Sequence, residues 1–158
     1  MAHFIIINNK VKSFNKKIII DSDKSISIRS LIFASLATGI SKIQNLLESE
    51  DIFNTIKSLK KLGIKIKKIK KIYVVHGLGI NKFKYKKKLT LNAGNSGTLA
   101  RLIASLLIRS PYKIKLIGDK SLSKRDFGRI IDPLSKFGAK FYPKNKKTLP
   151  LMIKHNKN

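Results

Sequence analysis

The sequence predicts an α/β fold built from repeated units. Segments with helical spacing of apolar residues alternate with short strand-like runs along the chain. Two helix-ending glycines, Gly63 and Gly138, lie 75 residues apart, and each is followed by a strand-like run. The helical segments Arg29-Ser30-Leu31-Ile32 and Arg101-Leu102-Ile103 have a similar separation. We therefore expect two copies of one α/β unit in a chain of 158 residues, which is long enough to bury a core.

Capping residues and glycines mark two helices in the first half of the chain. The first helix has Asp23 or Ser25 near its cap and Gly39 as its stop. The second begins after Ser49 and ends at Leu62-Gly63. Apolar runs and alternation predict the strands. The expected elements are strands at 3–7 and 16–21, a helix at 23–39, a strand at 40–46, a helix at 49–62, and strands at 64–67 and 72–75.

The second half repeats this order around one irregular helix. Pro133 lies inside the helical pattern of residues 126–137, so that helix either starts later or is kinked. The expected elements are a strand at 88–92, a turn at 94–98, a helix at 99–108, a strand at 112–117, a helix at 126–137 and a strand at 139–142.

The turn Gly94-Asn95-Ser96-Gly97-Thr98 joins a strand to a helix and predicts an anion site. The first turn of a helix has unpaired N–H groups and the positive end of the helix dipole. Glycine without a side chain lets a phosphate or carboxylate come close to the backbone. An ordinary capped turn, with Asn95 or Ser96 as N-cap, is the alternative interpretation.

Three basic or polar clusters fall at equivalent loop-to-helix junctions. The first contains Lys24, Ser25 and Arg29, with Ser25 and Arg29 on one helical face. The second is the glycine turn with Arg101, and the third is the segment 120–125. Such clusters suit a ligand with several anionic groups, because arginine pairs with carboxylate or phosphate through two N–H groups. Solvated basic stretches are the alternative.

The charge balance is strongly basic, with 35 Lys and Arg against 8 Asp and Glu, a formal net charge of +27. Such a charge attracts nucleic acid or anionic membranes. Lysine is nevertheless spread along nearly every segment, together with abundant isoleucine and asparagine, which indicates an AT-rich genome. We therefore expect no membrane partner and no functional nucleic-acid partner, although a small basic nucleic-acid-binding module stays open as an alternative.

Other chemistries receive little support from the residues. The chain has no cysteine, and its three histidines stand far apart, so we expect no disulfide and no metal site. The acids lie mostly at helix starts, where capping explains them. Neither a signal peptide nor a membrane span is apparent in the sequence, and we expect a cytoplasmic protein.

Taken together, the three clusters resemble the amino-terminal part of the 5-enolpyruvylshikimate-3-phosphate synthase family. The motifs, in order, are Asp23-Lys24-Ser25-Ile26-Ser27-x-Arg29, Gly94-Asn95-Ser96-Gly97-Thr98-x-x-Arg101-Leu102 and Gly118-Asp119-x-Ser121-Leu122-x-Lys124-Arg125. Ser49-Glu50-Asp51 and Asp132-Pro133-Leu134-x-x-x-Gly138-Ala139 extend the match over nearly the whole chain.

The resemblance implies transfer of the enolpyruvyl group of phosphoenolpyruvate to the 5-hydroxyl of shikimate 3-phosphate, without metal or organic cofactor. It places Lys24 at both substrates as the catalytic residue of this segment. Lys24, Ser25, Arg29 and Thr98 would bind shikimate 3-phosphate, and Lys24, Asn95, Gly97 and Arg125 would bind phosphoenolpyruvate. The enolpyruvyl transferase that acts on a UDP-sugar is the nearest alternative, although its usual cysteine is absent here.

The resemblance also implies an incomplete enzyme. Family members have two domains of three α/β repeats each and are expected to be monomers. Residues 1–21 would form leading strands of the other domain, and residues 22–158 part of one domain, with repeats at about 22–87 and 88–158. The partner would be the missing carboxy-terminal portion, and this chain alone is expected to be inactive. Asp21-Ser22, Ile28, Ile52 and Asp126 depart from the usual family residues.

Overall fold

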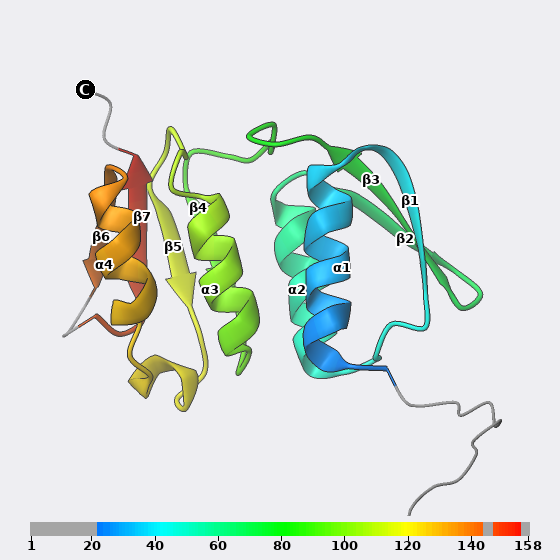
Figure 1. The fold of residues 1–158 in the computed structure, drawn as a ribbon, viewed down its shortest axis with the longest axis horizontal. Helices are drawn as coiled ribbons and strands as arrows, with labels where there is room; N and C mark the ends of the chain where they lie inside the picture. The colour runs from blue at the N-terminus through cyan, green and yellow to red at the C-terminus, as the bar shows by residue number, and fades with distance from the viewer. Residues whose placement is uncertain (1–21, 144–146, 156–158) are drawn as a thin grey trace, which may run out of the picture.

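The computed structural model describes residues 22–143 and 147–155 (Figure 1). The strands expected at 3–7 and 16–21 lie outside the described residues. The elements are α1 (Lys24–Leu36), β1 (Thr38–Gln44), α2 (Glu50–Lys61), β2 (Lys65–Ile69), β3 (Ile72–Leu78), β4 (Leu89–Asn92), α3 (Gly97–Leu106), β5 (Ile114–Ile117), the 3₁₀ turn η1 (Leu122–Lys124), α4 (Gly128–Lys136), β6 (Ala139–Pro143) and β7 (Leu151–His155).

The strands form one sheet of three strands and one of four, and three strands of the larger sheet follow the same order as the smaller sheet. One sheet has the order β1-β3-β2, and all its pairs are antiparallel. The other has the order β4-β5-β7-β6, in which only β4 and β5 are parallel. The sequence of elements from α1 to β3 therefore recurs from α3 to β7, and β5-β7-β6 corresponds to β1-β3-β2. The predicted α/β fold with repeated units is confirmed, whereas the unit boundaries near residues 87 and 88 stay predictions.

One apolar core joins the two units. Leu31 of α1, Ile52 of α2 and Ile103 of α3 are fully buried in it, and they come from both halves of the chain. Leu91 of β4 and Leu116 of β5 contribute to the same core from the four-stranded sheet. Because burial of apolar surface is the main favourable term in folding, this shared core stabilises the packing of the two units against each other.

Apolar residues are also exposed on the first helix. Ile26 and Phe33 of α1 are 58% and 67% exposed, although their neighbour Ile28 is fully buried.

Within the residues that the structure describes, no helix is long and apolar enough to cross a bilayer.

The first helix begins where the sequence predicts but ends earlier. The carboxylate of Asp23 accepts the N–H of Ile26 at 2.6 Å, so Asp23 rather than Ser25 is the cap. The helix ends at Leu36, because Ala37 is extended and its carbonyl accepts the N–H of Gly79 at 3.1 Å. Gly39 is therefore not a helix stop, and it lies inside β1 with a φ of +94°.

The remaining expectations agree with the structure within a few residues, with two exceptions. Gly63 and Gly138 end α2 and α4 with positive φ, as expected. The last helix starts at Gly128 rather than Asp126, and Pro133 still lies inside it. Strand β7 was not among the predicted strands, although its Leu151 and Ile153 alternate into the core.

Two glycines face each other across β1 and β3, and they differ in what they require. Gly39 pairs with Gly77 in the register of the two strands. A Cβ on Gly77 would lie 2.1 Å from the Ala37 carbonyl oxygen and 2.4 Å from that of Ala34. A Cβ on Gly39 would meet no atom within 4 Å, so only its positive φ opposes a side chain. Strand β3 thus passes in backbone contact with the end of α1.

We predict that Gly77→Ala destabilises the protein by about 3 kcal/mol, because overpacking against backbone cannot be relieved by a side-chain rotation. Gly39→Ala should cost only about 1 kcal/mol, the usual cost of a left-handed backbone for alanine. Urea unfolding of both variants and the parent chain measures the difference. Equal losses in the two variants would contradict the close contact of β3 with α1.

Candidate functional site

The N-terminal ends of the four helices lie along one edge of the molecule (Figure 1). Each helix of a unit follows a strand or loop that returns to this edge, so the positive ends of the helix dipoles are collected there. Lys24 begins α1, the glycine turn precedes α3, and the segment 118–125 precedes α4. All three clusters predicted from the sequence therefore lie at the same edge.

The glycine turn before α3 has open backbone donors. Ser96 is the N-cap, and its hydroxyl oxygen accepts the N–H of Leu99 at 3.2 Å. No hydrogen bond joins the backbone N–H of Gly97 or Thr98 to any other residue that the structure describes. Gly94, at a φ of +56°, turns the chain out of β4. Ser96 is thus the cap, as the alternative interpretation of this turn expects, and the anion site stays a prediction that the two uncapped N–H groups leave possible.

A polar network fixes Arg125 beside this turn. The guanidinium Nη2 of Arg125 donates to Oδ1 of Asn95 at 3.1 Å. Nδ2 of Asn95 donates to Oδ2 of Asp119 at 2.6 Å, and Oδ1 of Asp119 accepts the N–H of Leu122 at 2.6 Å. The backbone N–H of Asp119 in turn donates to the carbonyl of Gly94 at 2.9 Å. Asp119 thus joins the loop before α4 to the turn before α3.

Two guanidinium groups flank Gly97. A Cβ at Gly97 would lie 3.2 Å from Nη1 of Arg125 and 3.5 Å from Nη1 of Arg101. The guanidinium carbon of Arg101 lies over the ring of Phe127, 5.7 Å from the ring centroid. The Nε of Arg101 is buried without a partner among the described residues. Two positive groups that approach the same backbone position favour an anion between them.

Lys24 is held at the start of α2. Its Nζ lies 3.0 Å from Oδ2 of Asp51, whose side chain is only 13% exposed. The same helix reaches the glycine turn, because a Cβ on Gly94 would lie 2.3 Å from Nδ2 of Asn54. Lys24 is therefore linked to the turn before α3 through the first two turns of α2.

The predicted site residues fall into two groups by their contacts. Asn95, Gly97 and Arg125 are in direct contact with one another or with a shared neighbour. Ser25, Arg29 and Thr98 lie at the same edge, and their side chains make no hydrogen bond or ion pair with residues 22–143 and 147–155. These three side chains are therefore available for contact with a ligand.

Asp51 and Asp119 lie in motifs that the sequence analysis names, but their roles as partners of site residues are not predicted from the sequence. A signal for Asp119 exists in the segment Gly118-Asp119-Lys120-Ser121, because aspartate after glycine commonly accepts backbone N–H groups two or three residues later. No such signal exists for Asp51, because its contact with Lys24 depends on how α1 and α2 pack. Among the described residues no cluster of three metal-ligating side chains occurs.

The chain matches a protein-family model described as EPSP synthase (3-phosphoshikimate 1-carboxyvinyltransferase) over residues 8–158. The chain belongs to the EPSP synthase family. Similar proteins include the 3-phosphoshikimate 1-carboxyvinyltransferase of Vesicomyosocius okutanii, which is 42% identical over 154 residues, 98% of this chain and 34% of the relative. That of Streptococcus suis is 40% identical over 153 residues, 96% of this chain and 36% of the relative.

A solved EPSP synthase from Acinetobacter baumannii has the same fold over the matched part. The TM-score is 0.81 at 34% identity, and the match covers 89% of this chain and 32% of that one. The chain thus spans about a third of the length of the EPSP synthases that it matches.

The carboxylate of Asp119 is held in its charged form. The N–H of Leu122, the amide of Asn95 and the nearby charge of Arg125 all lower the pKa of Asp119 below its ordinary value of 3.8. A carboxyl whose pKa is lowered by folding contributes its full stabilisation of the folded state at pH values above its pKa in the unfolded chain. This stabilisation is lost as the pH falls through the pKa in the folded chain.

We predict that the Asp119 carboxyl titrates below pH 3.8, because its hydrogen-bond donors favour the charged form. Carbon-detected NMR of the side-chain carboxyl measures the midpoint. Protonation of Asp119 destabilises the folded chain as the pH falls from about 4 to the folded pKa of this group. The Asp119→Asn variant should lack this part of the acid destabilisation. Asp126→Asn is the matched control and should keep the Asp119 titration. A midpoint at or above 3.8 would contradict the network.

Proposed function

We propose that this chain carries the anion-binding part of a carboxyvinyl transfer from phosphoenolpyruvate to shikimate 3-phosphate. The observation that carries the proposal is the pair of guanidinium groups of Arg101 and Arg125 beside Gly97, at a helix start with two open N–H groups. Membership of the EPSP synthase family supports it, since the substrate named in that activity, 3-phosphoshikimate, carries a phosphate group.

The proposed phosphoenolpyruvate site is at the start of α3. One anionic group of the substrate would take the N–H groups of Gly97 and Thr98 and the guanidinium of Arg125, which Asn95 already orients. Charge-assisted hydrogen bonds to a fixed fork are stronger than neutral ones, and they define a direction. The network through Asp119 keeps Arg125 in place before the ligand arrives, so little ordering is required on binding.

The proposed shikimate 3-phosphate site is at the start of α1. Ser25 and Arg29 present a hydroxyl and a guanidinium on one helical face, and neither has a partner among the described residues. Lys24 precedes Ser25 in the sequence, and it contacts Asp51 at the start of α2, the helix that also reaches Gly94. Its ammonium would exchange the Asp51 carboxylate for substrate oxygens and neutralise charge as the two anions come together.

In the proposed reaction the 5-hydroxyl oxygen of shikimate 3-phosphate bonds to the central carbon of phosphoenolpyruvate. The methylene carbon gains a proton and the hydroxyl loses one, which gives a tetrahedral intermediate. Loss of phosphate and of a methyl proton restores the double bond in the product. Two acids near this edge, Asp51 and Asp119, are engaged, the first with Lys24 and the second with Asn95 and Leu122. We propose that the proton-transferring groups come from parts of EPSP synthases that this chain does not span, since the chain covers about a third of the length of its relatives.

We predict that the 158-residue chain binds shikimate 3-phosphate weakly and specifically, and that it catalyses no turnover alone. Arg29→Ala should weaken this binding at least about tenfold, because a charge-assisted hydrogen bond to phosphate is lost. Isothermal titration calorimetry at about 0.15 M salt, where distant charges are screened, measures the affinity.

Two controls separate specific binding from general attraction to a basic protein. Lys115→Gln removes one exposed positive charge from β5 and should leave the affinity within about twofold. Shikimate without its phosphate should bind more weakly than shikimate 3-phosphate. A small nucleic-acid-binding module would behave differently, because Arg29→Ala would then barely change the affinity for a DNA oligonucleotide and shikimate 3-phosphate would bind no better than inorganic phosphate. That outcome would overturn the proposal.

A further inference from the structure

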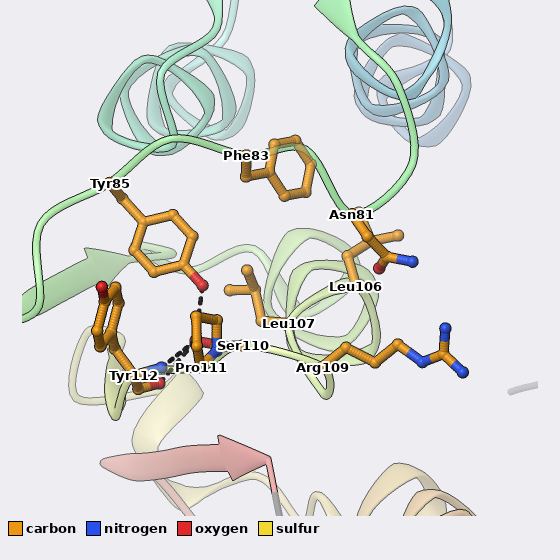
Figure 2. A pocket seen from close by; sticks show the side chains of 9 residues that line it. All are labelled: Asn81, Phe83, Tyr85, Leu106, Leu107, Arg109, Ser110, Pro111 and Tyr112. Carbon is orange, nitrogen blue, oxygen red and sulfur yellow. Dashed lines mark hydrogen bonds between the residues drawn. The ribbon is translucent and has the colours of Figure 1, made fainter. Parts of the chain in front are cut away.

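A separate hollow lies at the opposite end of α3 from the anion-binding edge (Figure 2). It is enclosed by the connection between β3 and β4 on one side and by the loop after α3 on the other. Helix α3 has 10 residues, so its length of about 15 Å separates this hollow from Gly97. The hollow is therefore not part of the site described above.

The walls of the hollow combine apolar and aromatic side chains with a few polar groups. Phe83 and Tyr85 come from the connection, and Leu106, Pro111 and Tyr112 come from α3 and the loop after it. The cavity volume is about 140 Å³, close to the engineered cavity of about 150 Å³ that holds one benzene ring. The volume of the space therefore matches a single six-membered ring.

The polar atoms in the wall already satisfy one another. The hydroxyl of Tyr85 donates to Oγ of Ser110 at 2.6 Å, and Oγ of Ser110 donates to the carbonyl of Tyr112 at 2.6 Å. The backbone N–H of Tyr112 donates back to Oγ of Ser110 at 3.1 Å. The rings of Tyr85 and Tyr112 meet edge to face, with centroids 6.2 Å apart. This network fixes both rings and makes the wall rigid before any ligand binds.

The tyrosine in the wall stays uncharged at neutral pH. Burial raises the pKa of Tyr85 above its ordinary value of 10.0. The interior of the hollow thus offers ring faces and neutral hydroxyl groups, and it contains no charge that would attract an ion inside.

The edge of the hollow is polar and positively charged. Figure 2 shows the carboxamide of Asn81 and the guanidinium of Arg109 on the same side, outside the apolar walls. Arg109 is exposed, and it forms no hydrogen bond or ion pair with the part of the chain that the structure describes. A guanidinium in this position can pair with a planar anionic group at the mouth, where that group keeps part of its hydration.

We propose that this hollow is a binding site for a small aromatic carboxylate with a single ring. The ring lies between Phe83, Tyr85 and Leu106, and the carboxylate points outward to Arg109 and Asn81. An aliphatic ligand would fill the space without stacking on the aromatic walls, and a neutral aromatic ligand would leave Arg109 without a partner.

Benzoate is the probe that tests the site, with acetate as the charged ligand without a ring and benzyl alcohol as the neutral ring. Amide chemical-shift changes in the 158-residue chain, measured by NMR at about 0.15 M salt, give both the affinity and the location. We expect benzoate to bind at least about fivefold more tightly than either comparison ligand. The shifts should centre on Arg109, Ser110 and Tyr112.

Two variants test the two halves of the proposal. Arg109→Gln should weaken benzoate at least about fivefold and leave benzyl alcohol unchanged, because only the charged contact is lost. Leu106→Phe should weaken both ring ligands, because it fills the hollow. Lys67→Gln removes an equal charge from the exposed side of β2 and should change neither affinity.

Three results would overturn the proposal. Acetate that binds as tightly as benzoate would show general attraction of anions to a basic protein. Benzoate shifts centred on Gly97 rather than Tyr112 would place the ligand at the other end of α3. Equal benzoate affinity in Arg109→Gln and the parent chain would show that the guanidinium does not bind the ligand. The Arg109→Gln variant is expected to fold, because Arg109 is exposed. The proposal does not depend on the proposed carboxyvinyl transfer.

Discussion

The common apolar core of the two units is the constraint on which the rest of the structure depends. Leu31, Ile52 and Ile103 bury completely only when α1, α2 and α3 pack against one another and against both sheets. That packing brings the start of each helix to one edge of the molecule. The side chains of the candidate site lie in the first turns of helices or in the loops that lead into them, so the core that positions the helices also positions the site. The close backbone contact at Gly77 belongs to the same constraint, because it sets how near α1 lies to its sheet.

Collecting helix starts and basic side chains at one edge is electrostatically unfavourable without a ligand. The structure offsets this repulsion with two carboxylates, Asp51 on Lys24 and Asp119 beside Asn95 and Arg125. The two carboxylates differ in what they permit. The ion pair of Lys24 and Asp51 can exchange partners when an anion arrives, whereas Asp119 accepts a backbone N–H and an amide and so fixes the loop itself. The candidate site thus combines positive side chains with carboxylates that hold the surrounding groups in place.

The sequence predicts the elements of this fold better than their contacts. Capping at Asp23, the stops at Gly63 and Gly138, and the turn with Ser96 follow from local preferences of single residues, and the structure has all of them. The prediction of Gly39 as the helix stop is wrong. A glycine after a helix is a common stop, but here the helix ends before Ala37, whose carbonyl accepts the N–H of Gly79. The contact of Lys24 with Asp51 depends on tertiary packing between two helices, which no local pattern reports. Recognition of the family depended on the order of three motifs, and no single motif would have sufficed.

The place of β7 in the sheet has a consequence for synthesis on the ribosome. This strand comes last among the described elements, yet it lies between β5 and β6 and pairs with both. When a nascent chain has emerged only as far as β6, that strand has no strand to pair with, because its neighbour is β7. Leu116 of β5 also lacks Leu151, its partner on β7. The four-stranded sheet can therefore close only after residue 155 has left the exit tunnel, while the three-stranded sheet is free to form much earlier. Synthesis from the N-terminus to the C-terminus thus lets the three-stranded sheet form before the four-stranded sheet, although the two units share one architecture.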